Sequence, residues 1–342
     1  MQNIIRIDNP HAINPAAIAA DLAQHKAVVI QFTQTPNSSL LDSLNALCQQ
    51  HDDQLTIRFY SDAFDVFDCT LLRQLPQLKS LELDCMMRAK HLEVLTELAH
   101  LKRLNLGVYE LKETEILAAN HFKSLIELTL GATKSKALNL EHLQHLTQLK
   151  HLFIEGHTKH IEAISALSQL NDLRLHGVSK VPLTFINPLK QLKSLTLTLG
   201  GRVNLDEVTE NSIEHLNLGR VRGFSHLNNL AQFSHLKTLH ISEQIQLETL
   251  DLTGCNKALQ AITLHDCKTL STLTGLANLS ALRYLRIWRT NLAFEKLLAS
   301  GTPDKLTHFS FFGNKNIENT DIHAKLSALG YQEANWSNLP KV

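Results

Sequence analysis

The stretch LKHLFIEGHTKHIEAISALSQLNDLRLHG, residues 149–177, contains one short pattern twice. Apolar residues stand at the first, fourth and sixth positions of Leu149–Ile154 and again of Leu170–Leu175, 21 residues later. Because alternate residues of a strand point to the same face, the last two apolar residues of each copy predict a strand with one buried face. A single strand cannot bury that face alone, so the pattern predicts copies that stack on one another.

Outward from this stretch the pattern recurs in both directions, at steps of 21 to 24 residues that average 22.8. Its copies begin at Leu78, Leu101, Leu125, Leu149, Leu170, Leu192, Ile213, Leu236, Leu259, Leu282 and Leu306. Leucine follows the same distribution, since 55 of the 64 leucines lie between residues 51 and 300. A period of this length indicates a repeat architecture.

The pattern resembles that of the leucine-rich-repeat family, L-x-x-L-x-L-x-x-N/C-x-L. The resemblance implies an α/β fold: a curved, horseshoe-shaped solenoid with parallel strands on its concave face. Upstream apolar residues spaced by threes favour 3₁₀ turns and short helices on the convex face, as in internalin-type and phosphatase-regulator-type repeats. Residues 247–252 have their own strand-like pattern and predict an additional pairing on the convex side.

The turn position of the family pattern departs from the consensus in this chain. Asn or Cys occupies that position only at Cys267 and Asn314, whereas residues such as Tyr109, His157 and Gly200 occupy it in other copies. We therefore expect the strands to keep the family register and the turns after them to be less regular.

The predicted organisation is an N-terminal cap of strand–helix units over residues 1–69, repeats over 70–315 and a helical cap over 316–342. Strands are predicted at 4–7, 27–32 and 55–60, on one sheet with the repeats. Three helices are predicted. The first begins at Pro15, the second follows Ser38 or Ser39 as its N-cap, and the third begins at Thr320 and is closed by Gly330.

Charge and hydropathy exclude several classes of partner. The chain has 33 Lys and Arg against 33 Asp and Glu, so a nucleic-acid or anionic-membrane partner is not expected. No basic segment followed by an apolar one predicts a secretory signal, and no apolar run is long enough for a membrane span. Five scattered cysteines favour reduced thiols. We expect a monomeric protein of the cytoplasm, although export as an effector by another route stays open.

Motifs for catalysis are missing from the sequence. Walker-type, G-x-G-x-x-G, G-x-S-x-G and H-E-x-x-H patterns do not occur, so we expect no enzymatic activity and no cofactor.

Five of the 19 histidines fall between residues 142 and 160. They suggest a metal or pH-responsive patch, but exposed polar positions are the favoured interpretation, and no metal site is predicted.

The main binding site predicted from the repeat register is a group of side chains on the concave face of the last repeats. It comprises Tyr284, Arg286, Trp288, Phe312, His265 and His308. Trp288 and Phe312 are expected in equivalent positions of neighbouring strands, about 5 Å apart. Tyr, Trp and Arg dominate interaction hot spots. The alternative is that the C-terminal cap folds back and buries this group, with Tyr331 and Trp336 as internal partners.

A second, polar patch is predicted on the concave face nearer the middle of the chain. It comprises Glu127, His151, Phe153, Glu155, Asp172, Arg174 and His176. Carboxylates next to histidines favour the charged imidazole and a polar contact surface.

These features together predict a non-enzymatic module that binds a protein or peptide on its concave face. Two other functions stay open: a bacterial effector that acts on a host protein, and an inhibitor or immunity-type binder of an enzyme or toxin. The residues do not choose among them.

Overall fold

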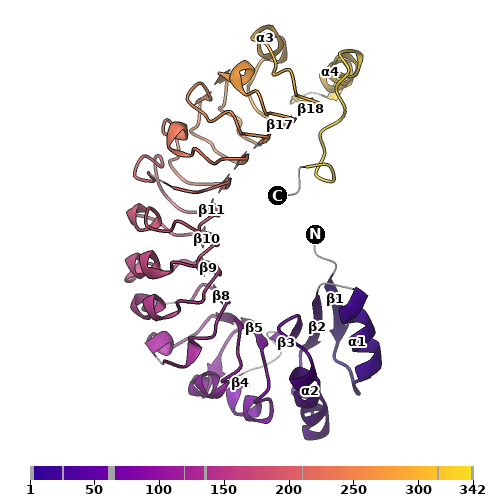
Figure 1. The fold of residues 1–342 in the computed structure, drawn as a ribbon, viewed down its shortest axis with the longest axis vertical. Coiled ribbons are helices and arrows are strands. Elements are labelled where there is room, and N and C mark those ends of the chain that lie inside the picture. The colour runs from indigo at the N-terminus through magenta and orange to yellow at the C-terminus, as the bar shows by residue number, and fades with distance from the viewer. Residues whose placement is uncertain are drawn as a thin grey trace. The chain divides into compact units, whose positions relative to one another are not determined.

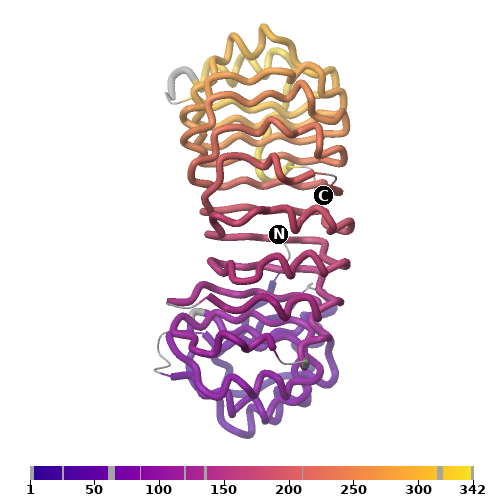
Figure 2. The backbone as a smooth tube through the Cα atoms, turned by 90° about the vertical axis from the view of Figure 1, so that its left-hand side faces the viewer, coloured from indigo at the N-terminus to yellow at the C-terminus, as the bar shows by residue number. Residues whose placement is uncertain are grey.

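The computed structural model describes residues 4–24, 27–60, 66–118, 120–134, 137–209, 211–313 and 316–339. The chain divides into two compact units, residues 1–170 and 171–342. Each unit is a stack of repeats in which one parallel strand follows the next in chain order (Figures 1 and 2).

The sheet of the first unit contains strands of the N-terminal cap and of the first repeats. In order these are β1 (Ile4–Asp8), β2 (Ala27–Phe32), β3 (Leu55–Tyr60), β5 (Ser80–Met86), β7 (Arg103–Val108), β8 (Glu127–Leu130) and β9 (His151–Glu155). All neighbouring pairs among them are parallel. Within this unit the strands of residues 4–60 and those of the first repeats thus belong to one parallel sheet.

The other side of the first unit changes from α-helices to 3₁₀ turns where the repeats begin. Its elements are α1 (Pro15–Gln24), α2 (Ser38–Gln50), η1 (Cys69–Gln74), η2 (Leu92–Glu97), η3 (Ile116–Ala118), η4 (Asn120–Phe122), η5 (Glu141–His145) and η6 (Ile161–Ala166), with a short pair of β4 (Phe67–Asp68) and β6 (Ala89–Lys90). The prediction of 3₁₀ turns from the apolar spacing is confirmed. Helix α2 begins one or two residues earlier than predicted from a Ser38 or Ser39 N-cap, because Asn37 is its N-cap and accepts a hydrogen bond from the Leu40 amide over 2.9 Å.

The second unit has the same arrangement. Its strands are β10 (Asp172–His176), β11 (Ser194–Thr198), β12 (His215–Gly219), β13 (Thr238–Ser242), β15 (Ala261–His265), β17 (Tyr284–Trp288) and β18 (His308–Phe312). Its other elements are η7 (Thr184–Ile186), η8 (Leu230–Gln232), η9 (Leu276–Asn278), β14 (Thr249–Asp251), β16 (Thr272–Thr274), α3 (Phe294–Ala299) and α4 (Asn316–Ala328).

Two elements of the second unit test predictions made for single segments. Strand β14 pairs in parallel with β16, which confirms the predicted additional pairing at residues 247–252. Helix α4 begins at Asn316 instead of Thr320, and Gly330 follows its end with a φ of +88°. A positive φ at that position is typical of a helix that ends with glycine.

The core of each unit is built from the repeated apolar positions. Both strand residues of the pattern are buried in all eleven copies, and neighbouring copies face each other in register, as Leu173 faces Leu195 and Leu285 faces Phe309. Side chains between these leucines point to the opposite face of the sheet, which we call the strand face.

The turns after the strands are more regular than predicted. The residue after the last strand position has a positive φ in seven successive repeats: Gly156, Gly177, Leu199, Arg220, Glu243, Asp266 and Arg289. Five of these are not glycine, although the left-handed conformation costs an ordinary residue about 1–2 kcal/mol. The expectation of irregular turns was therefore wrong.

Hydrogen bonds explain this regularity, because other side chains replace the consensus Asn. The Gln244 amide donates to the oxygens of Leu218 and Ser242, and the Cys267 thiol donates to those of Ile241 and His265. The second consensus match, Asn314, lies outside the described residues. Amide and thiol thus perform the same bonding inside the turn, and the sequence departs from the consensus without changing the fold.

Candidate functional site

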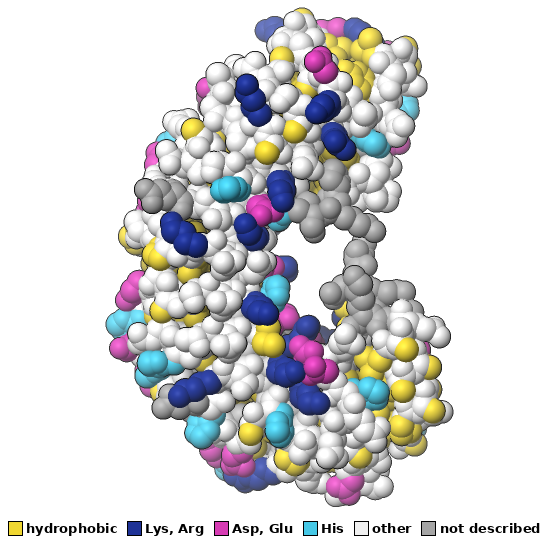
Figure 3. Space-filling model, viewed as in Figure 1, with side chains coloured by type: hydrophobic (Ala, Val, Ile, Leu, Met, Phe, Trp, Pro, Cys, Tyr) yellow, Lys and Arg dark blue, Asp and Glu magenta, His cyan; other side chains and the backbone are white. Residues whose placement is uncertain are grey.

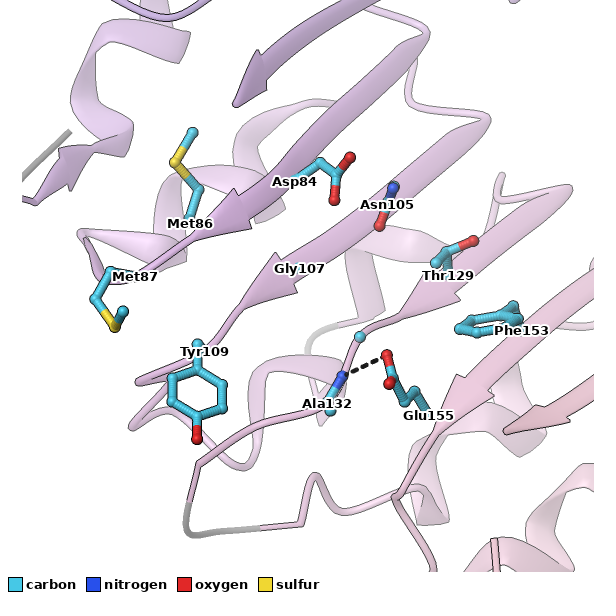
Figure 4. Close-up of a pocket in the computed structure, with 11 residues that line it drawn as sticks. Asp84, Met86, Met87, Asn105, Gly107, Tyr109, Thr129, Ala132, Phe153 and Glu155 are labelled. Carbon is cyan, nitrogen blue, oxygen red and sulfur yellow. Dashed lines mark hydrogen bonds between the residues drawn. The ribbon is translucent and has the colours of Figure 1, made fainter. Parts of the chain in front are cut away.

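A largely apolar hollow of the first unit lies on the strand face, at the carboxyl ends of β5, β7, β8 and β9. Its volume is about 380 Å³. Figure 4 shows Met87 and Tyr109 at one end of this first-unit hollow and Phe153 and Glu155 at the other, with Gly107 between them. Met87 is 42% exposed and Tyr109 46%, so both apolar side chains face solvent.

Two glycines form the floor of the first-unit hollow. Gly107 and Gly131 occupy the same row of the strand face on β7 and directly after β8. A Cβ atom at Gly131 would stand 3.1 Å from the Cα of Gly107, and one at Gly107 would stand 3.2 Å from the Leu83 oxygen. A side chain at either position would thus press on the neighbouring main chain, and the missing side chains leave the space that the larger residues surround.

A bulge between β5 and β7 places Tyr109 at the edge of the hollow. Leu83 faces Leu106, but Met86 then faces Val108, so β5 contains one more residue than β7 over this interval. Val108 takes the buried position that the repeat count assigns to Tyr109, and it is 1% exposed. Tyr109 is consequently displaced to the surface beside Met87.

Carboxylates lie at both ends of the first-unit hollow. Asp84 forms an ion pair with Arg58, and that guanidinium also lies 3.3 Å from Glu82 and 4.3 Å from the centre of the Tyr60 ring. Glu155 accepts a hydrogen bond from the Ala132 amide over 3.3 Å. Burial raises the pKa of Glu82, and Arg58 opposes part of that rise. The hollow thus combines apolar walls with a carboxylate at each end, of which Asp84 is paired with Arg58.

The polar patch predicted from the sequence contributes two residues to this hollow. Phe153 and Glu155 line it, whereas Glu127 and His151 face each other one row away. Glu127 lies 3.3 Å from Arg103, and His151 is exposed. The remaining members, Asp172, Arg174 and His176, belong to the second unit.

In the second unit these three residues form local contacts on β10. Asp172 accepts hydrogen bonds from Arg174, the shortest of which is 2.7 Å. The His176 ring lies 2.8 Å from the Thr198 hydroxyl on β11. The proposed contact role of these residues stays a prediction.

The aromatic pair predicted near the end of the repeats is confirmed in its geometry. Trp288 faces Phe312 across β17 and β18, and their ring centroids are 4.8 Å apart. His265 lies 5.9 Å from Trp288, and its imidazole is 3.0 Å from the Asp266 carboxylate. His308 stacks on Tyr284 at 6.4 Å. Four of the six predicted residues are partly exposed: Trp288, Phe312, His265 and His308.

Tyr284 and Arg286 are not exposed anchors, because the segment after α4 covers them. Tyr284 is 1% exposed and donates a hydrogen bond to the Asn335 oxygen over 2.9 Å. Arg286 is 8% exposed and donates to the Ala334 oxygen over 2.6 Å. The alternative in which the cap folds back is thus correct for these two residues, while Trp288 and Phe312 stay partly exposed beside them.

The internal partners expected for this group are also observed, with one difference. Trp336 packs over His240 with 5.6 Å between ring centroids, and it is 52% exposed. Tyr331 instead contacts the core residue Phe309 at 5.6 Å and the Thr302 hydroxyl at 2.8 Å. Tyr331 therefore fixes the cap to the repeats and does not cover the aromatic pair.

The five histidines between residues 142 and 160 do not form one patch. His142 and His145 lie on η5, His151 lies on the strand face, and His157 is buried under a turn. His160 precedes η6 and lies 3.3 Å from Glu162. Within the described ranges, no group of three His, Cys, Asp or Glu side chains has the arrangement of a metal site.

The surface charges are mixed in sign. In Figure 3, Lys and Arg side chains alternate with Asp and Glu side chains over the face in view. Ion pairs such as Arg103–Asp53 at 2.9 Å and Lys193–Glu214 at 2.9 Å contribute to this pattern. No helix within the described ranges has the length and apolarity that crossing a membrane requires.

Sequence reasoning did not identify Met87, Tyr109 or the two glycines as part of a site. Consecutive copies with glycine after the second strand leucine, Gly107 and Gly131, are a signal that could have indicated the hollow. The exposure of Tyr109 could not be found in this way, because it depends on the bulge.

Comparison with known proteins supports the fold. No protein-family model and no curated protein matches the sequence. An internalin (inlF) from Listeria monocytogenes has a similar structure, with 18% identity over 84% of this chain and 78% of that chain and a TM-score of 0.57. TLR13, solved in complex with ssRNA13, is 18% identical over 92% of this chain and 57% of that chain, with a TM-score of 0.53. At this identity the likeness concerns the fold alone.

Proposed function

We propose that this chain, a leucine-rich-repeat solenoid of internalin-like fold, is a non-enzymatic module that binds a protein partner on its strand face. The first-unit hollow is the main contact. Met87, Tyr109 and Phe153 are the apolar anchors, and Asp84 and Glu155 provide polar contacts at its ends.

One observation carries this proposal: Met87 and Tyr109, both more than 40% exposed, lie together at a hollow of about 380 Å³. Large apolar side chains that cluster at a surface hollow indicate an interaction site more strongly than single exposed ones do. Tyrosine is also among the residues that dominate binding energy at protein interfaces.

The charges at the hollow favour a protein over RNA as the partner. TLR13 was solved with an RNA, so both kinds of partner have to be considered for this fold. Phosphates are recognised by Lys and Arg, whereas the lining of the first-unit hollow contains carboxylates and no basic residue. A protein segment with apolar and basic side chains is the better complement to the apolar walls of the hollow and to the carboxylates at its ends.

We further propose that the protein is a monomer and that it works in a reducing compartment such as the cytoplasm. Cys48, Cys69, Cys255 and Cys267 are free and buried, and burial raises the pKa of the Cys69 thiol to about 12. Such thiols are inert and are typical of proteins that form no disulfides.

The test is photocrosslinking from the hollow. A photoreactive phenylalanine analogue replaces Tyr109 in one protein and Ile245 in a matched control, because Ile245 is 66% exposed and does not line this hollow. Each protein is incubated with lysate of the producing cell, and crosslinked proteins are identified by mass spectrometry. We expect a protein that crosslinks from position 109 and not from position 245.

A Met87→Ser/Tyr109→Ser variant completes the experiment. It should retain its fold and lose the partner identified by crosslinking, because both side chains are at the surface. Equal crosslinking from both positions, or full retention of the partner by the double variant, would contradict the proposal. A partner found only in lysate of a host cell would favour the effector function, and a toxin or enzyme as partner would favour the inhibitor function.

A further inference from the structure

Arg286 is a buried cation without an anionic partner. It lies in the middle of β17 and is 8% exposed. Within the described part of the chain, no carboxylate forms an ion pair with it, since the nearby Asp266 pairs with His265 at 3.0 Å and lies 3.8 Å from Arg289. A buried charge is costly unless it is paired and its donors are all bonded.

The hydrogen bonds of this guanidinium are incomplete. Nη1 donates to the Ala334 oxygen over 2.6 Å, but Nε is buried and has no partner. Three rings surround the group, with its Cζ 5.1 Å from the Trp288 ring, 5.7 Å from Phe312 and 5.5 Å from Trp336. Cation–π attraction offsets part of the cost of burial, but it supplies no acceptor for the Nε proton.

One acceptor that reaches Arg286, the Ala334 oxygen, belongs to the segment 332–339, which we call the tail. Residues 332–335 of the tail lie over β17 and β18 as an extended peptide ligand would, and a turn follows at Trp336 and Ser337. Ser310 accepts from the Ala334 amide over 2.9 Å, and Tyr284 donates to the Asn335 oxygen over 2.9 Å. Main-chain bonds join Gln332 to Thr307 and Phe309, each at 2.9 Å.

A neutral carbonyl is a weaker partner for Arg286 than a carboxylate would be. A carboxylate can accept from Nε and a terminal nitrogen side by side, which is the geometry that suits a guanidinium best. Such a ligand would satisfy the orphan Nε and neutralise the buried charge at once, whereas the tail does neither.

We propose that the surface beneath the tail is a second binding site, specific for a peptide segment with an Asp or Glu side chain, and that the tail occupies it in the absence of that segment. The incoming carboxylate binds Arg286, and its main chain takes the place of the tail at Ser310 and Tyr284. Trp288 and Phe312, partly exposed at the edge, then contact the rest of the segment. This inference rests on the proposed function, since it names a further contact for a protein partner.

The experiment uses the full chain and synthetic peptides that copy residues 332–339. Glu333 is replaced by Gln in all of them, and a single Asp is then placed at each position in turn, with an Asn peptide as the uncharged match for each. Affinity is measured by calorimetry. Release of the tail is followed by ¹⁹F NMR of protein containing 5-fluorotryptophan, whose two resonances are assigned with Trp288→Phe and Trp336→Phe.

We expect at least one Asp peptide to bind about tenfold or more tightly than its Asn match, as charge-assisted hydrogen bonds to a guanidinium imply. The Trp336 resonance should shift as that peptide binds, because the tail leaves. Trp336→Ala removes a tail contact without changing the site, so it should raise the affinity for the same peptide severalfold. Arg286→Met, which keeps most of the side-chain volume, should abolish the preference for Asp.

Three results would overturn the proposal: Asp and Asn peptides that bind equally, an Asp preference that survives in Arg286→Met, or binding that leaves the Trp336 resonance in place. If Arg286→Met fails to fold, Trp336→Ala decides by itself, because only a tail that competes with the peptide predicts a gain in affinity. Any of these results would contradict only the second binding site. The proposed function of the first-unit hollow is tested separately, through crosslinking from Tyr109 in the other unit.

Discussion

The Nε2 atom of His157 donates a hydrogen bond to the main-chain oxygen of Gly131, 2.9 Å away and one repeat earlier in the chain. Its Nδ1 atom accepts from the Leu138 amide over 3.1 Å, so the ring is the neutral tautomer with its proton on Nε2. His157 is 1% exposed, and burial lowers its pKa. This side chain joins two successive repeats in the way that the consensus Asn of the family pattern is expected to do.

Replacing His157 should therefore destabilise the first unit. We expect His157→Leu to lower the free energy of unfolding by about 2–4 kcal/mol, because it leaves a buried amide and a buried carbonyl without partners. His157→Asn should lose less, since an amide can both donate and accept. Urea unfolding checks this order, and His151→Leu on the exposed strand face is the control. A larger loss for Asn than for Leu would show that ring volume matters more than the bonds.

Stability should fall as the pH is lowered from 7 to 5. Desolvation lowers the pKa of His240 to about 4 from an ordinary value of 6.5, with a smaller contribution from His265. Between these values the unfolded chain binds the proton and the folded chain does not, so acid favours unfolding. The expected loss from His240 between pH 7 and pH 5 is about 2 kcal/mol, on the basis of 1.36 kcal/mol per unit.

The measurement is urea unfolding at several pH values in that range, with His240→Gln as the matched variant. Because Gln does not titrate, the free energy of unfolding of the His240→Gln variant should change less with pH than that of the wild type. The difference should equal the amount assigned to His240. Parallel curves for the two proteins would assign the pH dependence to other groups, among which His157 and His215 also have lowered pKa values.

Gly200 should not tolerate a side chain. A Cβ at this position would lie 2.3 Å from the Val178 oxygen, a main-chain atom that cannot move away without disturbing β10 and β11. We expect Gly200→Ala to cost about 2 kcal/mol or more, in the range of overpacked cores. Gly156→Ala is the control, because nothing lies within 4 Å of its Cβ and only its φ of +74° is unfavourable. Thermal unfolding of both variants tests the difference, and equal losses would contradict the steric argument.

Leu199 should be replaceable by glycine without loss. Its φ is +54°, and its side chain is 45% exposed. Glycine removes the strain of a positive φ, and it also has more conformational freedom in the unfolded chain, which favours unfolding. Because the first effect is equal to or larger than the second, Leu199→Gly should raise the free energy of unfolding by up to about 1 kcal/mol. Leu197→Gly, at a buried strand position, should instead lose about 3 kcal/mol or more. A clear loss for Leu199→Gly would mean that its side chain packs usefully despite its exposure.

The repeat pattern predicted the strands well because each buried pair such as Leu173 and Leu175 is decided by local alternation and a fixed period. It could also predict which residues share a row, and Trp288 and Phe312 are in the predicted arrangement. Neither result required knowledge of distant parts of the chain.

The sites were harder to predict, because they depend on contacts that the period does not encode. Tyr284 and Arg286 occupy strand-face positions, yet a segment some 50 residues later covers them, as the Tyr284–Asn335 bond over 51 residues shows. Tyr109 is exposed because Val108, one residue earlier than the repeat count predicts, takes the buried position opposite Met86. The turns were judged irregular because Gln244 does not match the consensus, although its amide makes the required bonds.

The bulge before Met86 has a genetic consequence. Loss of the Val108 codon would place Tyr109 second after Leu106, in the buried position opposite Met86, with no other change in composition. A contact surface that depends on the count of residues in one strand can arise or vanish in a single in-frame insertion or deletion, while the buried leucines on both sides remain as they are. We therefore expect an insertion or deletion at this point in a related gene to change the partner that the protein binds and to leave its fold intact.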